Sequence, residues 1–203
     1  MSQSSLVSPE AAPLHLLREV HHRMANSQAM LAAMLRREFI PFRDVELRQA
    51  LRRCEVQVLA ASELNRLLGT WGSTETTGDY FRSVCALLSK AVLTPLGISC
   101  EVFVADGTLP EEQRTYLAVI LAELVTNASK HAFRGQSSGC VRVEIETAGA
   151  EWLVRVIDNG FGFSTFEKGT GSRIVDSLVE MLGAEFRLDT GAQGTEICIA
   201  LHT

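Results

Sequence analysis

The chain has 203 residues, of which 46% are hydrophobic and 21% charged, and its formal net charge is −5. This composition is typical of a folded protein and argues against a disordered one. A negative charge argues against nucleic acid as the main partner, because phosphate backbones are bound by basic surfaces. No apolar run approaches the roughly 18 residues that span a bilayer, and the start lacks the pattern of a signal peptide. We therefore expect a cytoplasmic protein without membrane insertion.

The five cysteines are far apart and form no CxxC motif, so they predict neither a metal site nor a disulfide framework. We expect all five to be reduced and mostly buried, since free cysteine behaves as a small hydrophobic residue. They are Cys54, Cys85, Cys100, Cys140 and Cys198.

The first structured part, residues 14–69, carries a helical pattern and no strand signal. It follows a lead, residues 1–13, that we expect to be disordered. One helix is expected from Leu14 to Glu38, ending before a proline, and a second from an aspartate N-cap to Leu68, with glycine as its stop. These two helices predict an antiparallel hairpin.

The second of these helices carries apolar residues in alternating steps of four and three, which is the heptad pattern of helices packed in a bundle. Two helices alone bury such a seam poorly, so we expect a homodimer that forms a four-helix bundle. The polar Asn65 within the seam is either a register device or the mark of a frayed bundle end. The seam residues are Leu47, Leu51, Cys54, Val58, Ala61, Asn65 and Leu68.

A Gly-, Ser- and Thr-rich linker over residues 70–78 precedes a second part, residues 77–203, with mixed helix and strand signals. Together with the hairpin this predicts an α+β chain ending in an α/β sandwich. Helices are expected at residues 80–92, 111–133 and 172–182, and strands at 99–104, 141–147, 152–157, 185–189 and 195–201.

Three segments of the second part carry residues that could take part in ligand binding or catalysis. On the helix of residues 111–133, Glu123, Asn127, Lys130 and His131 share one face, although a polar stripe is also typical of a solvated helix surface.

The other two segments are rich in glycine. In Asp158-Asn-Gly160-Phe-Gly162 an acid ends an apolar strand, and glycines let the backbone approach a ligand closely, although Asp-Asn-Gly is also a common turn. In Gly169-Thr-Gly171 glycines lead into a helix, whose free N–H groups can hold phosphate.

Together and in this order, the three segments resemble the N, G1 and G2 boxes of the GHKL ATPases, a family that includes histidine kinases, gyrase-type topoisomerases, Hsp90-like chaperones and anti-sigma kinases. The resemblance covers about residues 77–203 and includes Gly194-Thr195-Glu196, similar to the closing Gly-Thr strand of the family. It implies a Bergerat-type sandwich that binds ATP and Mg²⁺.

The resemblance also implies roles for individual residues. Asn127 matches the Mg²⁺ ligand and Glu123 the acid that acts as a base or holds a Mg²⁺-bound water, while Asp158 matches the acceptor for the adenine amino group. Further residues would bind ATP, either by contacting its phosphates or by leaving room for the adenine ring and the phosphates. They are Lys130, His131, Gly160, Gly162, Gly169, Gly171 and Thr195.

The segment Arg18-Glu19-Val-His21-His22-Arg23 resembles the H-box of HWE-related histidine kinases, in which the phosphoacceptor histidine precedes arginine. At about 100° per residue, His22 lies nearly opposite the apolar side of the helix and His21 lies at its edge. An acceptor must be open to the γ-phosphate and to a response regulator, so we assign His22 as the acceptor and His21 as a flanking residue. Glu19, three residues earlier, is a candidate to accept the proton or orient the ring.

The resemblance predicts a two-component histidine kinase that autophosphorylates His22 and passes the phosphate to an aspartate of a response regulator. Because no sensor or receiver pattern is present, we expect a separate sensory partner. Three departures favour an alternative, a phosphotransferase or phosphatase with a non-catalytic ATP-like domain: Ala25-Asn26 in place of Lys-Asn, Gly-Thr-Gly-Ser in place of Gly-Leu-Gly-Leu, and only Ser164–Lys168 between the last two boxes. An anti-sigma-type kinase is disfavoured, because it predicts no histidine hairpin.

Overall fold

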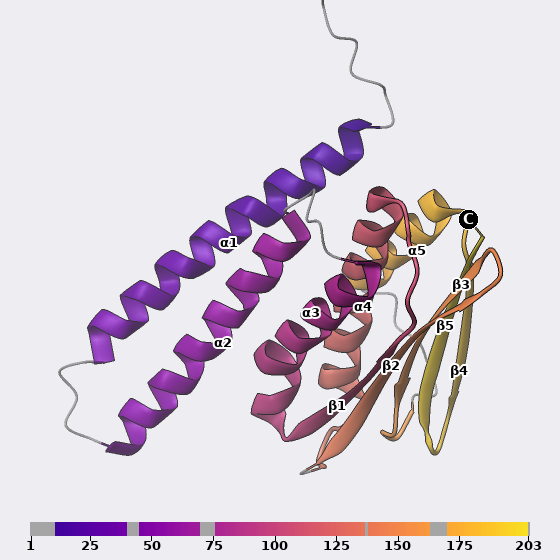
Figure 1. Ribbon diagram of the computed structural model, residues 1–203. Coiled ribbons are helices and arrows are strands. Elements are labelled where there is room, and N and C mark those ends of the chain that lie inside the picture. Colours follow the sequence, from indigo (N-terminus) through magenta and orange to yellow (C-terminus); the bar gives the residue numbers. More distant parts are fainter. Residues whose placement is uncertain (1–10, 40–44, 70–75, 137, 163–169, 203) are drawn as a thin grey trace, which may run out of the picture.

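The structure is a computed structural model that describes residues 11–39, 45–69, 76–136, 138–162 and 170–202. It begins with two long helices, α1 (Ala11–Phe39) and α2 (Val45–Gly69), which lie side by side as a hairpin (Figure 1). The rest of the chain forms a sheet with helices packed on it. The predicted α+β architecture is confirmed.

The second part contains one five-stranded sheet in the order β1-β2-β3-β5-β4. Strands β1 and β2 pair in parallel, and the other neighbouring pairs are antiparallel. Helices α3, α4 and α5 lie on one side of the sheet (Figure 1). The strands are β1 (Ile98–Val104), β2 (Gly139–Ala148), β3 (Glu151–Asp158), β4 (Glu185–Gly191) and β5 (Gly194–His202), and the helices are α3 (Thr77–Leu88), α4 (Glu111–His131) and α5 (Thr170–Leu182).

The two faces of the sheet differ in polarity because side chains alternate along each strand. On β3, for example, Trp152, Val154 and Val156 are buried in the core, while the residues between them are only half-buried. The opposite face carries ion pairs between strands, such as Arg142 with Glu101 at 2.9 Å. One face therefore holds the core, and the other faces solvent.

The hairpin is attached to this core through the end of α2. Leu64 and Leu68 are buried in the same hydrophobic cluster as Phe81 of α3 and Leu117 of α4, and Leu17 of α1 packs against that cluster. Burial at this junction stabilises the attachment, at about 25 cal/mol per Å² of apolar surface removed from water. The C-terminal end of α2 is thus anchored in the core of the second part.

Most of the expected elements are found within a few residues of their predicted bounds. α1 begins at Ala11, so residues 11–13 of the expected disordered lead belong to the helix, and Gly69, expected as a stop, lies in the last turn of α2. After α3 the chain continues through a π-helix (Ser89–Leu93) and a 3₁₀-helix (Thr94–Leu96). Residues 70–75 of the expected linker lie outside the described residues, and the division into domains stays a prediction.

Two further expectations concern the cysteines and the membrane. All five cysteines are free, as expected, but only Cys85 is buried and Cys54 is exposed, so the expectation of general burial was wrong. Within the described ranges, no helix combines the length and the apolar character needed to cross a bilayer.

Candidate active site

The polar face of α4 is the first part of the candidate site. Glu123 and Asn127 are half-buried, and Lys130 and His131 are exposed near the C-terminal end of the helix. The apolar residues Leu121, Leu124 and Val125 are buried on the other side. The helix therefore presents an acid, an amide and two basic side chains along one accessible stripe.

The second part of the site is the carboxylate of Asp158, at the end of β3. Asp158 is 7% exposed, and its Oδ1 atom accepts hydrogen bonds from the backbone N–H groups of Gly160 at 2.9 Å and Thr195 at 3.2 Å. Burial raises the pKa of Asp158, against the opposing influence of these hydrogen bonds and of the Thr195 hydroxyl. The result is a buried acceptor with a fixed orientation.

The loop after β3 is held against the end of α4. A Cβ atom at Gly160 would lie 2.2 Å from the carbonyl oxygen of Ala132, so only glycine fits there. The same oxygen accepts a hydrogen bond from the backbone N–H of Phe161 at 3.0 Å. Ala132 directly follows His131, so this contact brings Asp158 and the polar face of α4, which are distant in sequence, to the same end of the domain.

Further glycines fit this loop against the β4–β5 hairpin. Gly162 adopts a φ of 64°, and a Cβ atom there would lie 2.2 Å from the carbonyl oxygen of Gly191. Gly194, at the start of β5, packs on the backbone of Asp158. Gly171 lies in the first turn of α5, whereas Gly169 lies outside the described residues.

The two histidines of α1 differ in environment. His22 is exposed, whereas His21 is half-buried and its Nδ1 atom lies 2.7 Å from Oδ1 of Asn65 on α2. Burial lowers the pKa of His21, while the hydrogen bond to Asn65 and the nearby Glu123 carboxylate oppose that shift. The electrostatic influence of Glu123 shows that this turn of α1 lies near the polar face of α4.

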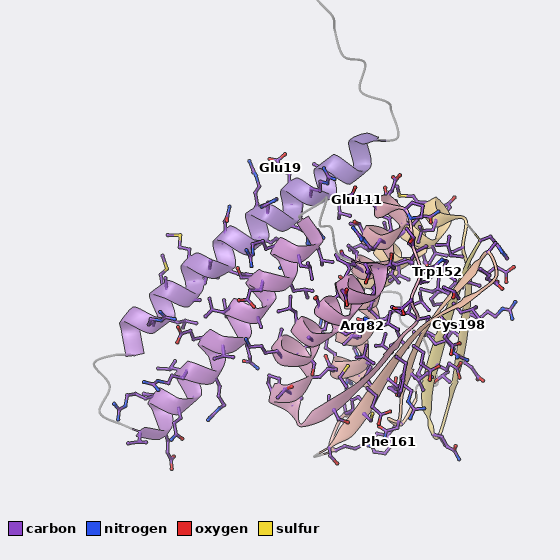
Figure 2. The ribbon with its side chains drawn as sticks, viewed as in Figure 1. Glu19, Arg82, Glu111, Trp152, Phe161 and Cys198 are labelled. Carbon is purple, nitrogen blue, oxygen red and sulfur yellow. The ribbon has the colours of Figure 1, made fainter. Side chains whose placement is uncertain are left out.

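Glu19, expected to act on His22, forms an ion pair with Arg23 at 3.1 Å and lies on the outward side of α1 (Figure 2). Its role toward His22 stays a prediction. Figure 2 also shows Phe161 at the end of the molecule away from Glu19. The structure therefore brings Asp158 and α4 together, and Glu19 of α1 lies away from Phe161 of the Asp158 loop.

Sequence reasoning left the role of Asn65 open and missed the residues Gln28 and Ala132. Asn65 was visible as a polar residue in the seam, and its buried position at a cross-helix hydrogen bond favours the register role over a frayed end. Gln28, its other side-chain partner, carried no signal. Ala132 acts through its backbone oxygen, which no side-chain pattern reveals.

A hollow of about 260 Å³ lies on the solvent-facing side of the sheet, away from α4, and none of the predicted site residues lines it. Among the described residues, no group of three or more His, Cys, Asp or Glu side chains could hold a metal ion.

Comparison with known proteins identifies both parts of the chain. Residues 112–203 match the family described as histidine kinase-, DNA gyrase B- and HSP90-like ATPase, and residues 19–92 match the HisKA_2 family of histidine kinases. The chain belongs to the histidine kinase family. Its two matched regions cover the hairpin, with both histidines, and the domain that holds Asn127 and Asp158.

Individual histidine kinases are similar over most of this chain. It is 29% identical to blue-light-activated histidine kinase 2 of Erythrobacter litoralis, over 90% of this chain and 56% of the relative. It is 30% identical to the sensor histidine kinase PdtaS of Mycobacterium tuberculosis, over 96% of this chain and 40% of the relative. The chain thus spans only about 40–56% of the length of these relatives.

Solved structures agree with this assignment. The histidine kinase domain of the E. litoralis EL346 blue-light-activated histidine kinase superposes with a TM-score of 0.61 at 27% identity, covering 94% of this chain and 95% of that one. The histidine kinase AdeS of Acinetobacter baumannii, at 17% identity, has a TM-score of 0.53 and covers 89% of this chain and 95% of that one, which shows the shared fold.

Proposed function

We propose that this histidine kinase chain is catalytically active: it phosphorylates His22 from ATP and transfers the phosphoryl group to an aspartate of a response regulator. The observation that carries the proposal is the buried, hydrogen-bonded carboxylate of Asp158 next to the polar face of α4, in the same chain as the exposed His22.

The residues around Asp158 fit ATP as the substrate. A buried carboxylate with a fixed orientation suits the adenine amino group, and Gly160 allows the backbone to lie close to the base. Asn127 would hold Mg²⁺ together with phosphate oxygens. Lys130 and His131, exposed on the next turn of α4, would stabilise phosphate charge, as would the N-terminal turn of α5 with Gly171. We propose the same role for Gly169, which lies outside the described residues.

In the chemical step, a neutral imidazole nitrogen of His22 attacks the γ-phosphorus. The N–P bond forms while the bond from that phosphorus to the β–γ bridging oxygen breaks, and ADP leaves with the bond electrons. Glu19 and Glu123 are the acids that we propose as proton acceptors for the imidazole. In the second step, an aspartate carboxylate of the response regulator attacks the phosphohistidine, which restores His22 and yields an acyl phosphate.

Glu19 of α1 lies away from Phe161 of the Asp158 loop (Figure 2), whereas Glu123 of α4 is near His21. The acceptor of the γ-phosphoryl group is then His22 of the same chain or His22 of a second copy. A homodimer through the hairpin suits the second route, and we propose that state for the chain. We also propose a cytoplasmic location and input from a sensory region or partner.

Incubation with γ-labelled ATP and Mg²⁺ tests the proposal. We expect an acid-labile label on the wild type, no label on His22→Ala and a strong loss of label on Asn127→Ala, with folding checked by circular dichroism. Label that persists on His22→Ala would contradict the acceptor assignment.

The short segment between the last two glycine motifs favours one alternative function. This alternative is a phosphotransferase or phosphatase with a non-catalytic ATP-like domain. That function predicts no label from ATP and no heat of nucleotide binding by calorimetry. It also predicts that a phosphorylated response regulator charges His22 in the reverse direction.

A further inference from the structure

A hydrogen-bond network joins α1 and α2 beside the proposed acceptor. The Oδ1 atom of Asn65 lies 2.7 Å from Nδ1 of His21 and forms a hydrogen bond with it. The Nδ2 atom of Asn65 donates hydrogen bonds to Oε1 of Gln28 at 2.9 Å and to the backbone oxygen of Ala61 at 3.1 Å. His21 and Gln28 lie two turns apart on α1, so one buried amide holds α1 at two points. We call this the His21–Asn65–Gln28 network.

The network fixes the tautomer of His21. The carbonyl oxygen of Ala61 only accepts hydrogen bonds, so the amide nitrogen of Asn65 faces it and the amide oxygen faces His21. The neutral His21 ring must then carry its hydrogen on Nδ1 and leave Nε2 without one. His21 is thus the donor of this hydrogen bond, and the other contacts of Asn65 fix the direction of its accepting oxygen.

Gly69, at the end of α2, lies against the same turn of α1. A Cβ atom there would come within 3.3 Å of Cδ2 of His22, 3.4 Å of the carbonyl oxygen of Arg18 and 3.5 Å of Cβ of His21. The ring edge of His22 therefore lies beside Gly69, where a side chain would crowd it, although His22 is exposed. Rotation of α1 about its axis would break this contact.

We propose that His21 is a positioning residue for the acceptor: through Nδ1 and the His21–Asn65–Gln28 network it fixes the rotation of α1, so that the His22 ring lies against Gly69 with its open side toward solvent. This inference rests on the proposed acceptor role of His22. It assigns His21 a function through Nδ1 alone and none in accepting phosphate.

Two substitutions of His21 separate this role from a role of Nε2. The amide nitrogen of asparagine lies near the place of histidine Nδ1, whereas that of glutamine reaches the place of Nε2. His21→Asn therefore keeps the donor to Asn65, and His21→Gln removes it. Asn65→Ala removes the acceptor, and Gln49→Ala, an exposed glutamine on α2 away from the network, is the matched control.

Two measurements are made on each variant, after circular dichroism has shown that it is folded. The first is the initial rate of labelling from ATP as a function of ATP concentration. The second is the nuclear Overhauser effect between Hδ2 of His22 and the Hα protons of Gly69, which reports the ring contact directly and needs no activity.

We expect His21→Gln and Asn65→Ala to lose the Overhauser effect and to label about tenfold more slowly at saturating ATP, with an unchanged KM for ATP, because a hydrogen bond of this kind is lost. His21→Asn and Gln49→Ala should keep both. If Asn65→Ala does not fold, the comparison of His21→Gln with His21→Asn alone tests the inference.

Three results would overturn the inference. They are an Overhauser effect that persists in His21→Gln, a labelling rate in His21→Gln equal to that of wild type, and a His21→Asn variant as inactive as His22→Ala. If the wild type itself takes no label, the proposed kinase activity is wrong, and the Overhauser effect alone then tests the inference. Loss of this effect in His21→Gln supports the inference, and its persistence contradicts it.

Discussion

The backbone N–H of Thr195 donates a hydrogen bond to the carboxylate of Asp158 at 3.2 Å, although 37 residues separate the two in sequence. This contact joins the start of β5 to the end of β3. Because the Gly160 N–H donates to the same oxygen, the carboxylate is oriented by the fold itself. Such preorganisation lowers the entropy cost of binding a ligand.

The substitution Asp158→Asn tests the role of this carboxylate. The amide keeps the shape but replaces a charged acceptor, and a hydrogen bond to a charged group contributes about 1.5–3 kcal/mol. We therefore expect calorimetry to show ATP affinity about 10- to 100-fold lower. The midpoint of thermal unfolding should not fall, because the cost of burying a charge disappears. Unchanged affinity would exclude Asp158 from the adenine contact.

The raised pKa of Asp158 predicts the pH dependence of ATP binding. Since the adenine amino group needs the ionised carboxylate, affinity should fall on acidification, with a midpoint above the usual range of aspartate. The folded state holds this proton more tightly than the unfolded state, so the contribution of Asp158 to the unfolding free energy decreases as pH rises from the ordinary to the raised pKa. Calorimetry over a pH series measures the midpoint, and Asp158→Asn should remove the step.

The contact of Gly160 with Ala132 predicts a sharp effect of a single methyl group. In Gly160→Ala the new carbon would lie 2.2 Å from a backbone oxygen, which cannot move as a side chain could. We expect a loss of about 1–3 kcal/mol in the free energy of unfolding, measured in urea, together with weaker ATP binding. Gly191→Ala is the matched control, since a Cβ there meets nothing within 4 Å; equal effects of both changes would argue against the packing explanation.

The elements of this protein were predictable because their signals are local. The β4–β5 hairpin follows from two alternating runs around a glycine-rich turn, and α4 from acidic residues that follow a proline. The polar face with Glu123 and Asn127 follows from helical spacing alone. For these parts, the interactions that determine the secondary structure are between residues close in sequence.

The tertiary contacts of the site were not predictable in the same way. Nothing local marks the backbone oxygen of Ala132 as the partner of Phe161, or Gln28 as a partner of Asn65. The seam of α2 shows the same limit: Leu68 is buried by the core of the next domain, whereas Leu47, from the same repeat, is exposed. Burial depends on which surfaces meet, and one helix pattern does not specify that.

An exposed apolar stripe on α1 supports the prediction of a homodimer. Val20, Met24, Leu31 and Met34 follow at helical spacing, and each is at least 44% exposed in the single chain. We expect Met24→Glu and Leu31→Glu to dissociate the dimer, because a charge would have to be buried in an apolar interface. Sedimentation velocity over a concentration series measures this, with Gln49→Glu on α2 as the control. A wild type that sediments as a monomer throughout would contradict the homodimer.

We expect the phosphoryl group to pass between the two copies of the proposed homodimer. His22→Ala keeps the nucleotide residues but lacks the acceptor, and Asn127→Ala keeps the acceptor but lacks the Mg²⁺ ligand. Neither should label well alone, whereas a mixture allowed to exchange subunits should label the Asn127→Ala chain, identified by a size tag. A variant with both changes, mixed with His22→Ala, is the control and should stay unlabelled. If the wild type labels and the mixture does not, the phosphoryl group reaches His22 within one chain.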